Sequence, residues 1–202
     1  MVLLSSNYTT MNKKTFILTI VAAALTGALP VSAQQAPPAR AASTGGNSPH
    51  ETTSAVIDGN RVTISYGRPF TKNPRSGEVR KIWGGLVPYG KAWRMGSDEA
   101  TLMVIQQQIA IGETVIPAGA YTLYMVPDET GTSKLAISKK IGGWGIPVDE
   151  KNDLARVDLK KDALDKSVDQ FTMGAEKNPA GGGLIKLKWE NTQYSVAFVN
   201  KK

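Results

Sequence analysis

The chain has 202 residues, with 24 Lys and Arg against 17 Asp and Glu, one histidine and no cysteine. The lack of cysteine excludes thiol catalysis, disulfide bonds, cysteine-based zinc clusters and a lipoprotein anchor. Hydrophobic residues make up 41% and charged residues 20%, which is typical of a globular protein and not of a disordered or multi-span membrane chain. The length predicts one domain with its own hydrophobic core.

The N-terminal part of the chain has the pattern of a secretory signal peptide. A short cationic run at 12–14 precedes an uncharged apolar run over 15–29, which is shorter than the roughly 20 residues that span a bilayer. The residues that follow fit a cleavage site after Ala33. We therefore expect residues 1–33 to be a signal peptide, and Met11 to be the true start of translation.

Removal of this segment changes the charge and sets the expected location. The formal net charge falls from +7 to +5, because Lys13 and Lys14 are the only charged residues removed. The other basic residues are scattered, without a run of four, which argues against a nucleic-acid partner. We expect a periplasmic or secreted protein with no stable membrane anchor after cleavage. Residues 34–48, rich in Ala, Pro, Gly, Ser and Gln, predict a disordered linker before a single domain over 49–202.

The domain follows the two-residue period of β-strands. Apolar and polar residues alternate over 62–66, and again over 185–189 and 194–198, which predicts half-buried strands. Tyr66 is in phase with the apolar residues of the first strand, so we place its side chain in the core. The break at 190–193 predicts a terminal hairpin between the last two strands.

Further short strands are expected between these. A turn at Gly112 and Glu113 separates two of them. Helical patterns are limited to short turns near 149–154 and 162–168, so the crossover helices of a parallel α/β fold are not expected. We predict an all-β fold, an antiparallel β-sandwich or jelly-roll-like domain of about 8–10 short strands. The additional strand ranges are 102–105, 109–111, 114–116, 120–126, 135–138, 155–159 and 171–173.

The alternation stops between residues 67 and 101, where glycine and proline are frequent. The segment holds two of the four tryptophans of the chain, Trp83 and Trp93. A loop this rich in aromatic and guanidinium groups is either a binding surface or a plug pinned over one end of the sandwich. The candidate ligand-binding residues are Arg68, Arg80, Trp93, Arg94 and Glu99.

Three strings in and around this segment resemble a family of exported bacterial proteins. They are Ser-Tyr-Gly-Arg-Pro at 65–69, Gly-Leu-Val-Pro-Tyr-Gly-Lys-Ala-Trp-Arg-Met-Gly-Ser-Asp-Glu-Ala-Thr at 85–101 and Ile-Pro-Ala-Gly-Ala-Tyr-Thr-Leu at 116–123. Over residues 48–199 the chain is similar to domain of unknown function number 2911. The resemblance implies secretion but no particular activity. It also implies Asn in many members at the position of Asp98, which argues against an essential acid there.

Two pairs of charged residues in this segment need to be weighed, namely Arg94 with Glu99 and Asp98 with Glu99. Arg94 and Glu99 can form a bidentate ion pair that only fixes the loop, or Arg94 can bind an anionic or hydroxylated ligand that Glu99 orients. Asp98 and Glu99 are weak candidates for a general acid and base. Neighbours in a strand point to opposite faces, so both can act on one bond only where the backbone is irregular.

The remaining candidates are aromatic residues and the single histidine. Trp144, in a glycine-rich loop, has a flat face for a sugar ring or an aromatic ligand, as do Trp83 and Trp93, and burial in the core is the alternative. We expect His50 to be a solvated loop side chain. It cannot support a site built on several imidazoles, and no calcium-loop motif occurs, so neither a metal nor a cofactor is predicted.

These observations favour a non-enzymatic exported domain. It would bind a small ligand, glycan, organic anion or cell-envelope component through segment 67–101. One alternative is a glycosidase-like hydrolase that uses Glu99 with a remote carboxylate. The other is a structural interaction domain, which would expose a large apolar patch.

Overall fold

The structure, a computed structural model, describes residues 48–201. The expected signal peptide over 1–33 and the expected linker up to residue 47 lie outside the described residues. No helix within 48–201 has the length and apolar character needed to cross a membrane. The elements in chain order are β1 (His50–Ile57), β2 (Asn60–Gly67), β3 (Thr101–Ile105), β4 (Ile109–Ile111), β5 (Thr114–Ile116), β6 (Gly119–Val126), β7 (Lys134–Ser138), the 3-10 helix η1 (Glu150–Asn152), β8 (Asp153–Asp158), β9 (Lys160–Lys177) and β10 (Gly183–Asn200).

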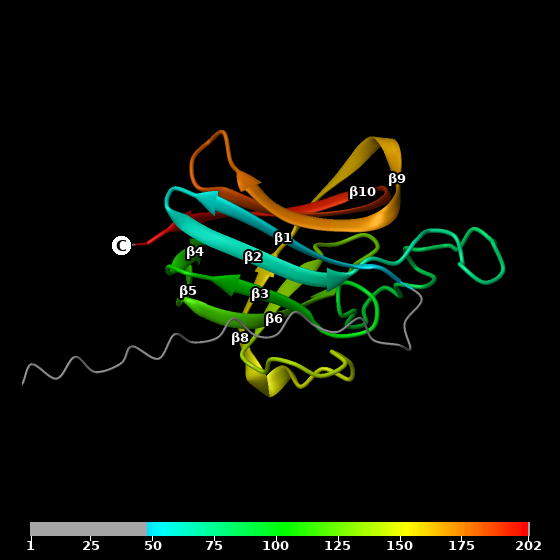
Figure 1. Cartoon of the computed structure of the whole chain (residues 1–202), viewed down its shortest axis with the longest axis horizontal. Coiled ribbons are helices and arrows are strands. Elements are labelled where there is room, and N and C mark those ends of the chain that lie inside the picture. The colour runs from blue at the N-terminus through cyan, green and yellow to red at the C-terminus, as the bar shows by residue number, and fades with distance from the viewer. Residues whose placement is uncertain (1–47, 202) are drawn as a thin grey trace, which may run out of the picture. The chain divides into compact units, whose positions relative to one another are not determined.

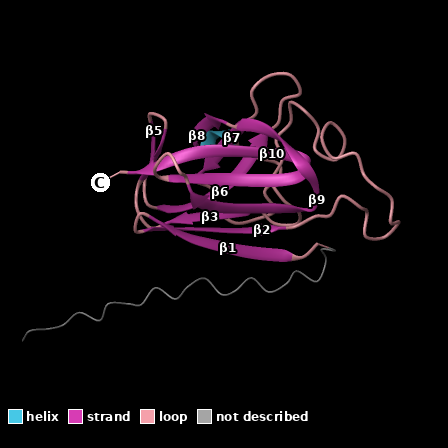
Figure 2. Cartoon of the chain, turned by 90° about the horizontal axis from the view of Figure 1, so that it is seen from above, coloured by secondary structure: helices cyan, strands magenta, loops and turns pink. Residues whose placement is uncertain are grey.

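The strands form two antiparallel sheets. A six-stranded sheet has the order β1-β2-β3-β6-β7-β8, and a four-stranded sheet has the order β5-β4-β10-β9. Figure 1 shows β1, β2, β3 and β6 following one another, with β9 and β10 above them. In Figure 2 the fold is almost entirely strand and loop. The prediction of an all-β antiparallel sandwich is confirmed, and ten strands lie in the described part of the chain.

The core lies between the two sheets and follows the period of two. In β2, the side chains of Val62, Ile64 and Tyr66 are at most 2% exposed, whereas Arg61 is exposed. The buried position predicted for Tyr66 is therefore confirmed. Burial of these alternating side chains, at roughly 25 cal/mol per Å² of apolar area, is the main term that holds the strands together. Ile185, Leu187 and Trp189 of β10 are equally buried in the other sheet.

The predicted terminal hairpin is wrong, because residues 183–200 form one strand that pairs with β9 over most of its length. The buried side chains change from odd positions, ending at Trp189, to even positions, starting at Tyr194. The ladder is irregular on both sides of Glu190, whose φ is +49°. The extra residues of this irregularity lie on β9, because β10 runs only from 188 to 192 while β9 runs from 172 to 163, and β10 continues as one strand. The break in the alternation of apolar and polar residues therefore marks a bulge and not a hairpin turn.

The helical turn expected near 162–168 is also wrong, since these residues belong to β9. This strand lies at the edge of the four-stranded sheet, only Phe171 and Met173 of its 18 residues are buried, and its apolar residues are sparse. Pairing with β10 outweighs the weak local preference. The turn expected near 149–154 is confirmed as η1, where the side chain of Asp149 accepts a hydrogen bond from Lys151 N.

The long connection between β2 and β3, residues 68–100, covers one end of the core. Thr71 N donates to Asp169 O of β9 over 2.7 Å. Trp93 and Met125 of β6 exchange two backbone hydrogen bonds of 2.8 and 2.9 Å. The connection is thus attached to both sheets, which fixes its side chains relative to the core.

Candidate functional site

The aromatic residues of the connection belong to the core. Trp93 is 9% exposed, and its ring stacks on that of Trp189 at 5.8 Å with an interplanar angle of 19°. Its edge contacts include Phe171 at 5.0 Å and Trp83 at 6.0 Å. Such pairs stabilise the fold beyond their buried area. Trp83 and Trp93 therefore act as the plug considered from the sequence.

Two of the candidate arginines are held by β9 and its neighbours. Arg68 Nε lies 3.2 Å from Phe171 O and 3.1 Å from Glu51 Oε2, while its Nη2 donates to Thr172 Oγ1 over 3.1 Å. Arg80 Nη2 donates to the backbone oxygen of Phe70. These guanidinium groups satisfy backbone and side-chain acceptors around the plug.

Arg94 lies apart from these two and contacts an exposed tryptophan. Its Nη1 donates to Trp144 O over 3.1 Å, and its guanidinium carbon lies 5.1 Å from the centre of the Trp144 ring. The Trp144 side chain is 52% exposed. Partial burial lowers the pKa of Arg94, and the negative charges of Asp98 and Glu99 oppose that effect. The charges of Asp98 and Glu99 therefore act on the Arg94 guanidinium.

His50 brings the two carboxylates together. Its Nε2 lies 2.9 Å from Glu99 Oε2 and 3.7 Å from Asp98 Oδ2. Two neighbouring carboxylates can face one group only where the backbone is irregular. The backbone is irregular here, because Asp98 has a φ of +66° and Met95 a φ of +56°. Adjacent carboxylates can therefore face the same imidazole. His50 is the first residue of β1, not a free loop side chain.

Asp98 shows two features that are unusual for a purely structural acid. It is 9% exposed, and its Oδ2 has no hydrogen-bond partner among the described residues. Its positive φ lies in the region that Asn and Asp tolerate best after glycine. This explains why the family resemblance implies Asn at the same position. A buried polar oxygen without a partner is rare in proteins, and for this reason Asp98 is kept as a candidate site residue.

The glycine-rich loop after β7 completes this surface. Ala100 N donates to Gly143 O over 3.2 Å. Gly145 has a φ of +81°, and a Cβ added there would lie 2.9 Å from Ala100 Cα and 3.1 Å from Arg94 Cβ. Only glycine lets the loop approach so closely, and this approach places Trp144 on Arg94. We call His50, Arg94, Asp98, Glu99 and Trp144 the outer cluster.

The candidate residues predicted from the sequence therefore lie in two separate parts of the structure. Arg94, Asp98 and Glu99 belong to the outer cluster, whereas Arg68, Arg80 and Trp93 belong to the plug. Sequence reasoning missed His50 as a member, because 49 residues separate it from Glu99 and no motif connects them. Within residues 48–201, no group of three or more His, Asp or Glu side chains is arranged to hold a metal ion.

The fold and this cluster define a class: a two-sheet antiparallel β-sandwich whose β2–β3 connection forms both a core plug and an outer polar surface. The chain belongs to the family described as protein of unknown function DUF2911, whose profile matches residues 48–198. Neither a curated protein nor a solved structure matches the chain. The family membership confirms the resemblance seen in the strings at 65–69, 85–101 and 116–123.

Proposed function

We propose that this protein is an exported binding domain that holds a glycan or other small hydroxylated envelope component at the outer cluster. The observation that carries the proposal is the exposed Trp144 ring, stacked on Arg94, beside two carboxylates that meet at His50. Binding sites commonly combine an apolar face with a few convergent polar groups.

The chemistry of the outer cluster supports a hydroxylated ligand. The flat face of Trp144 can pack on the apolar face of a sugar ring, since the indole is 52% exposed. Asp98 and Glu99 accept hydrogen bonds from hydroxyl groups, and Arg94 donates them. Because the carboxylates outnumber the guanidinium, an organic anion fits this surface less well than a neutral or cationic ligand.

A ligand screen tests this proposal. The purified protein is heated with saccharides, peptidoglycan fragments and organic anions, and a binding ligand raises the Tm. Arg94→Ala and Trp144→Ala should abolish the shift. Arg61→Ala is the matched control, because Arg61 is an exposed arginine of β2 outside the outer cluster. If no compound raises the Tm, or if Arg61→Ala abolishes the shift as well, the proposal is refuted.

One observation also favours the hydrolase alternative, namely that both carboxylates face one imidazole on an irregular backbone. In that case protonated Glu99 would give its proton to the leaving glycosidic oxygen, while water, losing a proton to His50, would attack the anomeric carbon. The same saccharides are assayed for released reducing ends. Cleavage that disappears in Glu99→Gln while binding persists would establish hydrolysis, and intact saccharides would reject it.

A further inference from the structure

Three large apolar side chains are exposed on one short loop, which follows β7 and ends at η1. Eight large apolar side chains are exposed in the described part of the chain, and three of them fall within the six residues 141–146. They are Ile141, Trp144 and Ile146, which are 56%, 52% and 44% exposed. Single exposed apolar residues are ordinary on a protein surface, whereas a gathered set marks an interaction site. We call residues 139–148 the lysine–tryptophan loop.

The lysine–tryptophan loop projects from the end of the six-stranded sheet. Figure 1 shows it, in yellow-green, beyond the lower end of β8 and away from β9 and β10. Gly142 and Gly143 have φ of +82° and +76°, and a Cβ added at either would meet no atom within 4 Å. The base of the loop is fixed, because Lys139 N donates to Asn152 O over 2.9 Å. The apolar side chains are therefore held out into solvent.

The loop begins with two lysines and has no acid before Asp149. Lys139 and Lys140 are exposed, and no acid of residues 48–201 forms an ion pair with either of them. A lysine side chain can lay its methylene groups along an apolar surface while its ammonium reaches a charged group. Apolar side chains next to these positive charges match a partner whose apolar interior is bordered by anions.

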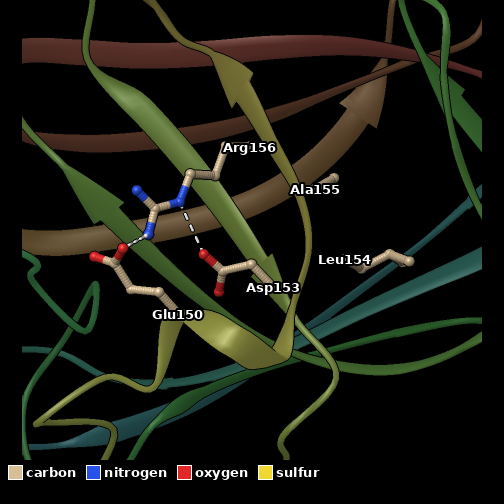
Figure 3. A pocket seen from close by; sticks show the side chains of 5 residues that line it. All are labelled: Glu150, Asp153, Leu154, Ala155 and Arg156. Atoms are coloured by element: carbon tan, nitrogen blue, oxygen red, sulfur yellow. Dashed lines mark hydrogen bonds and ion pairs between the residues drawn. The ribbon is translucent and has the colours of Figure 1, made fainter.

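The acidic residues that follow the loop are engaged within the protein. The side chain of Asp149 caps η1 by accepting a hydrogen bond from Lys151 N. Glu150 and Asp153 are both paired with Arg156, at 3.0 and 2.8 Å, as Figure 3 shows. These carboxylates therefore oppose the two lysines less than unpaired carboxylates would.

The two carboxylates of the outer cluster are also largely shielded. The side chains of Asp98 and Glu99 are 13% and 18% exposed, and both have an oxygen within 3.7 Å of His50 Nε2. Arg94, whose guanidinium carbon lies 5.1 Å from the centre of the Trp144 ring, adds a cation beside the apolar side chains. The loop thus presents apolar and basic groups to a partner.

The size of this patch decides between a protein partner and a lipid partner. Specific protein interfaces use about 20–30 residues on each side, which is far more than this loop offers. Insertion into a lipid surface needs only a few apolar side chains with basic neighbours. Tryptophan also prefers the boundary between headgroups and acyl chains, where its ring is in apolar surroundings and its N–H is solvated.

We infer that the lysine–tryptophan loop binds the surface of a bilayer that contains anionic lipid. Ile141, Trp144 and Ile146 enter the boundary between headgroups and acyl chains, while Lys139 and Lys140 stay at the level of the phosphates. The contact is weak and reversible, because three half-exposed side chains bury less apolar area than one acyl chain does. This membrane contact goes beyond the ligand binding proposed above and does not depend on it.

Vesicle sedimentation tests this inference. The chain from residue 34 onward is used, because it contains both sheets and the core between them, whereas the apolar run at 15–29 would bind lipid by itself. Phosphatidylcholine vesicles with about 30% phosphatidylglycerol, or with none, are added up to about 5 mM lipid, which detects binding weaker than that of one myristoyl chain. We expect binding to the anionic vesicles that weakens in high salt. Absence of binding would overturn the inference.

Tryptophan fluorescence locates the contact. Trp83, Trp93 and Trp189 are at most 9% exposed, so brominated lipid should quench mainly Trp144. Trp144→Phe should keep an apolar ring in the loop, and with it vesicle binding, but should remove the quenching. Quenching that persists in Trp144→Phe would place the contact elsewhere and overturn the inference.

Variants of the loop test the two kinds of contact. Ile141→Ser should weaken binding to anionic vesicles about fivefold, and Lys139→Gln together with Lys140→Gln should weaken it about 20-fold. Val115→Ser is the matched control, because Val115 is a 46% exposed apolar residue of β5 outside the loop. Equal weakening by Val115→Ser, or unchanged binding in the lysine variant, would overturn the inference. All substituted side chains are exposed, so circular dichroism should show an unchanged fold.

The same variants separate this inference from the proposed function. Ile141 and the two lysines lie outside the outer cluster, so their variants should lose vesicle binding and keep the Tm shift with saccharides. A saccharide shift without vesicle binding refutes only the inference, and vesicle binding without a saccharide shift refutes only the proposed function. A dimer that forms without lipid and is lost in Ile141→Ser would assign the loop to a second copy of the chain and overturn the inference.

Discussion

Replacing Trp93 by alanine tests whether the β2–β3 connection is a structural plug. The ring is 9% exposed and packs against Trp189, Phe171 and Trp83. A buried aromatic side chain removes about 200 Å² from water, which at about 25 cal/mol per Å² corresponds to about 5 kcal/mol. Measured losses for buried Trp→Ala substitutions are about 3–5 kcal/mol. We therefore expect Trp93→Ala to lower the free energy of unfolding by about 3–5 kcal/mol.

The matched comparison is Trp144→Ala, a substitution of the same chemistry at a 52% exposed position. Its expected cost is below about 1 kcal/mol, because only an exposed cation–π contact with Arg94 is lost. Urea unfolding followed by far-UV circular dichroism measures both variants without relying on tryptophan fluorescence. For Trp93→Ala the Tm should fall by about 6–20 °C. Equal losses in the two variants would refute the assignment of Trp93 to a plug.

Three further predictions concern the backbone and the buried tyrosine. Asp98→Asn should change the free energy of unfolding by less than about 0.5 kcal/mol. Asp98→Ala should lower it by about 1–2 kcal/mol, because alanine tolerates a φ of +66° poorly. Indistinguishable urea midpoints for the two variants would contradict this prediction. Gly67→Ala should cost about 1–3 kcal/mol, since its Cβ would lie 2.2 Å from Ser97 O. Gly174→Ala, where an added Cβ meets nothing closer than 3.8 Å, is its control in the same denaturation assay, and a similar loss there would count against the clash. Burial raises the pKa of Tyr66 from about 10 to about 12, so the unfolded chain releases this proton first and stability should fall as the pH rises from 10 to 12. Tyr66→Phe should make that fall shallower, and an unchanged slope in pH-dependent urea unfolding would disprove the link.

The sequence by itself determined the fold class and most of the strands. Alternation at Val62, Ile64 and Tyr66 depends on the two faces of one strand, which is a local property of the chain. The same holds for the turn at Gly112 and Glu113, which joins β4 and β5. The strings that resemble the family could also be recognised from the sequence, because recognising them does not depend on which residues they contact. Local periodicity therefore sufficed wherever one face of a strand is buried.

The tertiary structure alone decided how the strands connect and which polar groups meet. Nothing local distinguishes the bulge at Glu190 from a hairpin turn, because the difference lies in the pairing of β10 with β9. His50 and Glu99 are distant in the chain, and their contact arises only after β1 pairs with β2 and the connection closes over the core. Trp93 and Arg94 are neighbours in sequence, yet one enters the aromatic core and the other reaches Trp144 at the surface. Side-chain direction in an irregular segment is set by long-range packing, and for that reason composition could point to this segment but could not divide its residues between plug and site.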